Sequence, residues 1–106
     1  MSESQFHEQA DHIYLLIEDQ IDDLGVDLDY EISGGVMTIT CELDDSKVIL
    51  SRQSATAEIW VAARSGGFHF REENGSWHCA TGEELAELLS RVLSEQTKES
   101  VVVALR

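Results

Sequence analysis

Apolar residues recur at intervals of three or four positions near the start of the chain. The series runs Phe6, Ala10, Ile13, Ile17, Ile21 and Leu24, which is the spacing of one buried face of an α-helix. Ser2 followed by Gln5 has the form of a capping box, and Gly25 is typical of a helix end. His7, Asp11, Glu18 and Asp22 fall together on the opposite side. The pattern predicts one long amphipathic helix with an acidic outer face.

The following segment changes to strict alternation. Residues 27–32 alternate acidic and apolar side chains, which is typical of a half-buried strand. Further strands are predicted over residues 36–43, 47–53, 57–63, 68–71 and 77–79. Short turn sequences separate them, and the glycine pairs 34–35 and 66–67 are expected in hairpin turns. Because such short connections join neighbouring strands, the pattern predicts an antiparallel meander.

A second helical pattern follows the strands. Thr81 with Glu84 reads as a capping box, and the apolar stripe is Leu85, Leu88, Leu89, Val92 and Leu93. We therefore predict a single α+β domain over residues 1–106, a two-layer α-β sandwich. Its N- and C-terminal helices pack on one face of the meander sheet, and the other face is open to solvent. The apolar tail 101–105 is predicted to pack along the helix layer.

The charge of the chain is strongly negative and unevenly distributed. There are 21 acidic residues against 7 Lys and Arg, a formal net charge of -14, and no Lys or Arg precedes Lys47. This argues against nucleic acid as a partner. A patch that attracts cations or a basic protein surface is one interpretation. The other is a solvated helix face that keeps the protein soluble.

The sequence predicts a cytoplasmic protein with no membrane partner. Its longest apolar runs, residues 13–17 and 101–105, are far shorter than the about 20 residues of a membrane helix. No basic segment followed by an apolar stretch marks a signal at the N-terminus. Cys41 and Cys79 have no CxxC spacing and are predicted to be buried, reduced thiols in strands.

Two short motifs suggest metal enzymes and fall short of them. The segment 7–11 differs from the HExxH zinc-protease signature because Asp11 stands at the second histidine. His7 and Asp11 lie one turn apart and could share a metal, yet a catalytic site needs a third ligand and shelter. Residues 27–31 hint at an EF-hand loop, but Ile32 stands where glycine is required. His12, His69 and His78 are expected to have no acidic neighbours.

The carboxylates of the first helix and first strand are the strongest candidate for chemistry. Ferrous and ferric iron, and other divalent cations, accept carboxylate oxygens as ligands. Solvated carboxylates on a helix surface do not preorganise a coordination sphere, so binding is expected to be weak, exposed and poorly selective. A metal-dependent enzyme, either an iron oxidase or a hydrolase using the same carboxylates, is the alternative interpretation.

The sequence resembles the frataxin family, and in particular its bacterial branch, over essentially the whole chain. The stretch 59–70, IWVAARSGGFHF, matches the family pattern of a Trp-bearing strand, a glycine turn and an aromatic-His-Phe strand. Residues 34–39 and 51–53 agree in order and spacing, while Ser54-Ala55 replaces a proline common after the Arg-Gln pair.

The resemblance implies a non-enzymatic role for this chain. It would be an iron-binding regulator or adaptor of iron–sulfur cluster assembly that docks on the cysteine desulfurase and its scaffold machinery, and a monomer when metal-free. The implied metal-binding residues, here called the acidic ridge, are Glu3, His7, Asp11, Glu18, Asp19, Asp22, Asp23, Asp29 and Glu31. Asp27 aligns ambiguously. The implied partner-binding residues are Glu18, Asp19, Asp22, Asp23 and the outward-facing Trp60. Whether the family role is iron donor or inhibitory regulator stays open.

Overall fold

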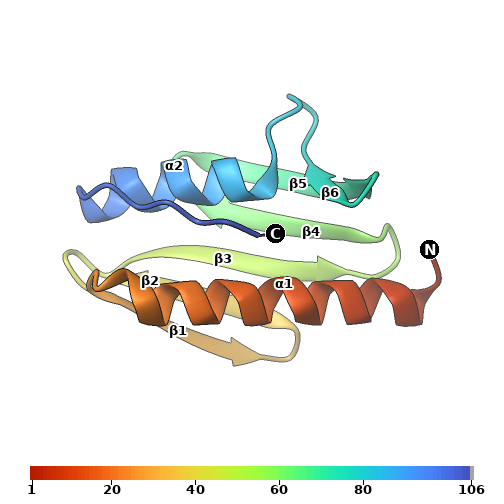
Figure 1. Ribbon diagram of the computed structural model, residues 1–106, viewed down its shortest axis with the longest axis horizontal. Coiled ribbons are helices and arrows are strands. Elements are labelled where there is room, and N and C mark those ends of the chain that lie inside the picture. The colour runs from red at the N-terminus through yellow and green to blue at the C-terminus, as the bar shows by residue number, and fades with distance from the viewer. Residues whose placement is uncertain (106) are drawn as a thin grey trace.

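The computed structural model describes residues 1–105, and the predicted domain extends to Arg106, which lies outside the described residues. The elements in order are α1 (Glu3–Leu24), β1 (Leu28–Ser33), β2 (Val36–Cys41), β3 (Ser46–Gln53), β4 (Glu58–Ala63), β5 (Gly66–Glu73), β6 (Ser76–His78) and α2 (Leu85–Thr97). The strands form one antiparallel sheet in the order β1-β2-β3-β4-β5-β6. Both helices cover the same sheet face (Figure 1). The predicted α+β sandwich is confirmed.

The core lies between the helices and the sheet. α1 contributes Phe6, Ala10, Ile13, Tyr14, Ile17 and Ile21, and the facing strand residues include Met37, Ile39, Leu50, Ile59 and Phe70. α1 begins as predicted, because the Ser2 hydroxyl accepts from the Gln5 amide at 3.1 Å and Gln5 Oε1 accepts from the Ser2 amide at 2.8 Å. Its C-cap is Gly25, with a left-handed φ of 67°. Among the described residues no helix is long and apolar enough to cross a membrane.

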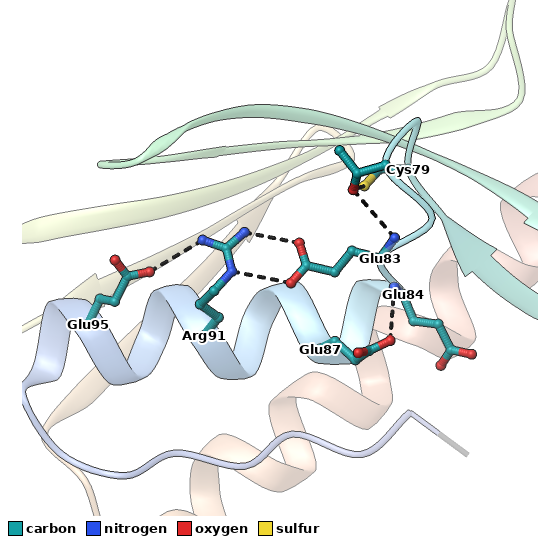
Figure 2. A network of polar contacts seen from close by, with 7 residues as sticks. Cys79, Glu83, Glu84, Glu87, Arg91 and Glu95 are labelled. Atoms are coloured by element: carbon teal, nitrogen blue, oxygen red, sulfur yellow. Dashed lines mark hydrogen bonds and ion pairs between the residues drawn. The ribbon is translucent and has the colours of Figure 1, made fainter.

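The start of α2 differs from the prediction. Its N-cap is Glu84, whose amide donates to Glu87 Oε1 at 3.2 Å (Figure 2). The Thr81 hydroxyl instead accepts from the Glu83 amide at 3.4 Å and lies 3.1 Å from Cys79 Sγ. The predicted Thr81–Glu84 capping box is wrong, because Glu84 still pairs with His78 in an isolated β-bridge. The helix therefore begins later than the Thr-x-x-Glu pattern suggests.

Three details of the strands also depart from the predictions. The β4–β5 turn is Arg64-Ser65, because Gly66 and Gly67 already pair with Ala63 and Ala62 inside the sheet. Ile32 is 41% exposed at the end of the edge strand β1, where the helix layer does not cover it. Cys41 is buried as predicted, whereas Cys79 is only half-buried, since it follows β6 in the loop before α2.

The C-terminal tail runs between the two helices (Figure 1). Val101 and Val103 are buried, and their amides donate to the hydroxyls of Ser94 and Ser90 on α2, each at 2.9 Å. The Gln20 side-chain amide of α1 hydrogen-bonds the backbone of Ala104 with both its donor and its acceptor. The predicted packing of the tail along the helix layer is confirmed.

Candidate functional site

The structure divides the acidic ridge into three parts. The N-terminal half consists of Glu3, His7 and Asp11 on α1, and the C-terminal half consists of Glu18, Asp19, Asp22 and Asp23 on the same helix. The strand part consists of Asp29 and Glu31 on β1. All nine side chains reach solvent, and only His7 and Glu18 are half-buried. The three parts have different neighbours, which decides what each can bind.

The C-terminal half is a run of carboxylates without a counter-charge. None of its four residues belongs to an ion pair among the described residues, and no basic residue occupies the last turn of α1. The C-terminus of a helix carries a partial negative charge of its own, so acids there are unfavourable. The four carboxylates repel each other and the helix dipole, and a bound cation would relieve both effects.

Tyr30 connects this half to the sheet. Its hydroxyl donates to the Asp22 carboxylate, with distances of 3.2 and 3.3 Å to the two oxygens. Burial raises the pKa of Tyr30, and the hydrogen bond and charge of Asp22, with the charges of Glu18 and Asp19, raise it further. Since Tyr30 faces α1 and side chains alternate along a strand, Asp29 and Glu31 project from the opposite, open face of the sheet. The strand part therefore continues the ridge around the edge of the sheet.

The N-terminal half contacts an arginine that the sequence analysis did not assign to the site. Arg52, on β3, donates through Nη2 to Asp11 Oδ1 and through Nη1 to His7 Nδ1, the latter at 3.4 Å. Its guanidinium lies over the Tyr14 ring, 4.8 Å from the centroid. Strand alternation was the signal for it: Val48, Leu50 and Arg52 share the core face of β3. A charge on a core face requires a partner.

The ridge does not form a closed metal cage. Among residues 1–105, no three His, Cys, Asp or Glu side chains converge closely enough to hold a metal ion. His7 and Asp11, which by spacing could share a metal, are brought together around Arg52 instead. Asp27 is exposed at the entry to β1, where its carbonyl accepts from the Glu42 amide at 3.0 Å. A cation here would keep much of its water and contact one or two carboxylates.

Trp60 lies on the open face of the sheet. It is 36% exposed, as expected, and its ring stacks on His69 with centroids 4.1 Å apart and an interplanar angle of 6°. Its indole Nε1 donates to Glu58 Oε1 at 3.0 Å, while Arg71 Nε donates to Glu58 Oε2 at 2.7 Å. These two hydrogen bonds lower the pKa of Glu58 to about 2, and the one from Trp60 has the larger effect. The indole is thus held in one orientation at the surface.

His78 and the main cavity lie away from the ridge. His78, expected to lack acidic company, has its Nε2 3.5 Å from Glu84 Oε1, because the bridge between residues 78 and 84 brings them together. A cavity of about 660 Å³ lies between the start of α1, the β5–β6 turn and the tail, with Trp77 and Leu105 in its lining. No residue of the acidic ridge lines that cavity.

The basic residue of α2 is also engaged within the fold. Arg91 donates to both oxygens of Glu83, at 3.0 and 3.2 Å, and to Glu95 at 3.4 Å (Figure 2). Its guanidinium lies 5.7 Å from the Phe68 ring centroid. Glu83, just before α2, and Glu95, on α2, therefore have a local counter-charge, unlike the acids at the end of α1.

Comparisons with known proteins point in one direction. The family model described as a frataxin-like domain matches residues 1–99. Two curated relatives named iron-sulfur cluster assembly protein CyaY are similar to this chain. The protein from Stutzerimonas stutzeri is 48% identical over 104 residues, covering 95% of this chain and 94% of the relative. The protein from Photobacterium profundum is 39% identical over 102 residues, covering 95% and 96%.

Solved structures agree with the sequence comparisons. The frataxin from Psychromonas ingrahamii superposes with a TM-score of 0.90 at 33% identity, covering 100% of this chain and 99% of that one. A trimeric yeast frataxin complexed with ferrous iron has a TM-score of 0.72 at 24% identity, covering 86% and 87%, and this likeness concerns the fold alone. The matched sequence, the meander sheet and the two helices on one face together show that the chain belongs to the frataxin family.

Proposed function

We propose that this protein binds iron weakly and acts as a regulator or adaptor of iron–sulfur cluster assembly, docking on the cysteine desulfurase through the acidic ridge. Membership of the frataxin family supports the general role, because the CyaY relatives carry the name of that process. We expect it to act in the cytoplasm as one domain, and as a binding protein rather than an enzyme.

The observation that carries the proposal is the unneutralised C-terminal half of the ridge. Four carboxylates occupy the last two turns of α1 without an ion pair in the described part of the chain. Such an arrangement attracts cations and basic protein surfaces and speeds their encounter. Local counter-charges elsewhere, such as Arg91 on α2, show that the fold does neutralise acids at other places.

Iron enters this proposal as cargo or signal. Ferrous and ferric ions accept carboxylate oxygens, and an open helix face allows them to keep several waters. Other divalent cations of similar preference would compete. Because iron and a basic partner would use the same carboxylates, each would alter the binding of the other.

The partner surface extends from the ridge across the open sheet face. Glu31 on β1 pairs in register with Thr38, Thr38 with Ile49, and Ile49 with Ala62 on β4. Paired residues share a face, and Trp60 shares the face of Ala62 because the two are two positions apart on β4. The strand part of the ridge and Trp60 therefore lie on one continuous surface. We propose that the carboxylates steer association and that the rigid indole of Trp60 anchors the bound state.

The test is the association of the purified chain with the desulfurase at several salt concentrations. The double variant Asp22→Lys, Asp23→Lys should associate about tenfold more slowly at low salt, with a weaker salt dependence. The variant Trp60→Ala should associate at the normal rate and dissociate faster. Stopped-flow or surface-based kinetics measures both rates.

A matched control separates the ridge from net charge. The double variant Glu95→Lys, Glu99→Lys has the same change in charge, placed in and just after α2. It should alter association by less than about twofold if the ridge is the docking surface. Equal slowing by both double variants would mean that only the total charge matters, and the proposed docking surface would be wrong.

A further inference from the structure

The environment of Arg52 is unusual for a charged residue beside an acidic surface. Its side chain is only 15% exposed, while its partner Asp11 is 67% exposed. Its Nε is buried without a hydrogen-bond partner. A guanidinium that has given up this much water needs a nearby anion, because an unpaired buried charge is strongly unfavourable. Arg52 is therefore tied to the N-terminal half of the ridge.

The contact with Arg52 favours one tautomer of a neutral His7. Arginine only donates hydrogen bonds, so His7 Nδ1 accepts from Arg52 Nη1 through its lone pair. The proton of a neutral His7 then sits on Nε2, which lies 3.9 Å from Glu3 Oε1. A metal ion also requires an imidazole lone pair. In this arrangement neither nitrogen of His7 offers one.

Packing holds the guanidinium in place. The Tyr14 hydroxyl donates to the carbonyl of Gly35 at 2.8 Å and lies 3.2 Å from that of Leu50, which fixes the ring beneath Arg52. The aliphatic stem of Arg52 lies over Gly35, where an added Cβ would be 3.6 Å from Arg52 Cδ. The Tyr14 ring, Gly35 and strand β3 together hold the guanidinium so that it faces His7 and Asp11.

We infer that Arg52 is a built-in counter-cation that occupies the N-terminal half of the acidic ridge and thereby confines external cations to the C-terminal half and the strand part. This rests on the proposed cation binding of the ridge and narrows it. His7 and Asp11 are then engaged within the fold of the native protein. Removing the Arg52 charge would open a new cation position at His7 and Asp11.

Titration with Mn²⁺ alone, followed by paramagnetic broadening of backbone amide and histidine side-chain NMR signals, tests the inference. In the native chain, broadening should begin around residues 18–23 and 29–31 and spare His7 and Asp11. In Arg52→Met, the apparent affinity at His7 and Asp11 should rise about tenfold, because a unit positive charge a few Å away has been removed. The amide spectrum itself reports whether the variant is folded.

The matched control is Arg64→Met. It removes the same charge from another arginine–aspartate pair, Arg64 Nη2 to Asp44 Oδ2 at 2.7 Å, located at the opposite end of β3 from Arg52. Any new broadening in this variant belongs at Asp44, and His7 should behave as in the native chain. Broadening at His7 in both variants would trace to net charge and overturn the role of Arg52.

The outcomes separate this inference from the proposed function. Early broadening of His7 and Asp11 in the native chain, equal to that at Asp22, would overturn the inference while supporting a cation-binding ridge. Broadening absent from residues 18–31 of the native chain would contradict the proposed cation binding, whereas a gain at His7 in Arg52→Met would still support the role of Arg52 as the counter-cation of the N-terminal half. Should Arg52→Met not fold, Arg52→Gln removes the charge while keeping hydrogen-bond donors that can reach Asp11. Its His7 signals should broaden more than native because the positive charge is gone, and native-like behaviour would overturn the inference.

Discussion

The two halves of the acidic ridge lie on one helix and look alike in sequence, yet they differ in their surroundings. In the N-terminal half, Asp11 and His7 contact Arg52, which reaches them from β3. In the C-terminal half, the only side-chain hydrogen bond to a carboxylate within the described chain comes from the neutral hydroxyl of Tyr30. The comparison teaches that a carboxylate is available to a ligand only where the fold has not already supplied a cation.

The same difference decides what each carboxylate does for stability. A carboxylate that pairs with a buried guanidinium stabilises the native state, because it compensates a charge that has lost its water. A carboxylate among like charges at a helix C-terminus destabilises it. Neutralising one acid in each half should therefore change the free energy of unfolding in opposite directions.

The largest effect is expected for Asp11→Asn. It weakens the charged hydrogen bond to Arg52 and should lower the free energy of unfolding by about 1–2 kcal/mol, toward the lower end because Asp11 is largely exposed. Urea unfolding at neutral pH measures this. The control Glu8→Gln, an exposed acid on the same helix, should stay within about 0.5 kcal/mol of native. Native-like stability of Asp11→Asn would remove the contrast between the halves.

A smaller effect of opposite sign is expected for Asp23→Asn. It removes one like charge from the last turn of α1 and should raise the free energy of unfolding by about 0.3–1 kcal/mol at low salt. The gain should shrink as salt is added, because these charges are exposed and screened. Unfolding curves at two salt concentrations provide the measurement. A loss of stability would show that Asp23 makes a favourable contact in solution.

The smallest effect concerns the two tyrosines, one beside each half. Burial is the main cause that raises both pKa values above 10.0, but Arg52 lowers the pKa of Tyr14 while Asp22, Glu18 and Asp19 raise that of Tyr30. Added salt should lower the pKa of Tyr30, because its neighbouring carboxylates are exposed and screened, and leave that of buried Tyr14 unchanged or slightly higher. Carbon-13 NMR of the tyrosine rings, assigned with Tyr30→Phe, measures both values.

The direction of the linked stability follows from these pKa values. Because each phenol holds its proton more tightly in the folded state, its contribution is complete below pH 10. It is then lost as pH rises through the raised pKa. The free energy of unfolding of Tyr30→Phe should therefore fall less steeply with rising pH in this alkaline range. A downward shift of both tyrosine pKa values with salt would mean that the two halves have the same electrostatic character.

Periodicity was sufficient to predict the layers of the fold. The three- and four-residue spacing of α1 and the alternation within the strands depend on local geometry, so the sequence alone reveals them. The start of α2 was mispredicted because Glu84 pairs with His78, and the Gly66-Gly67 pair was misplaced because both residues are paired within the sheet. Both depend on neighbours that spacing does not show.

The candidate site was predictable only in part, for the same reason. The ridge residues follow from their places on α1 and β1 and from the frataxin resemblance. The pairing of Arg52 with Asp11 joins residues 41 positions apart, and no short motif connects them. Strand alternation indicated that Arg52 faces the core, but its partner depends on how α1 crosses the sheet.

Within the described residues, the backbone of the C-terminal tail hydrogen-bonds to side chains of α2 and not to a neighbouring strand. The amides of Val101 and Val103, two residues apart in extended chain, attach to the hydroxyls of Ser94 and Ser90, four residues apart on α2. Two extended residues advance about 6.6 Å and four helical residues about 6 Å, so the two repeats nearly coincide. Four residues before Ser90, the next position in this series on α2 is Ala86, which has no hydroxyl. The adjoining amide of Ala104 donates to Gln20 of α1 instead. The two serines, whose spacing on α2 matches the spacing of the tail residues, thus determine how far the chain can follow α2 before it contacts both helices.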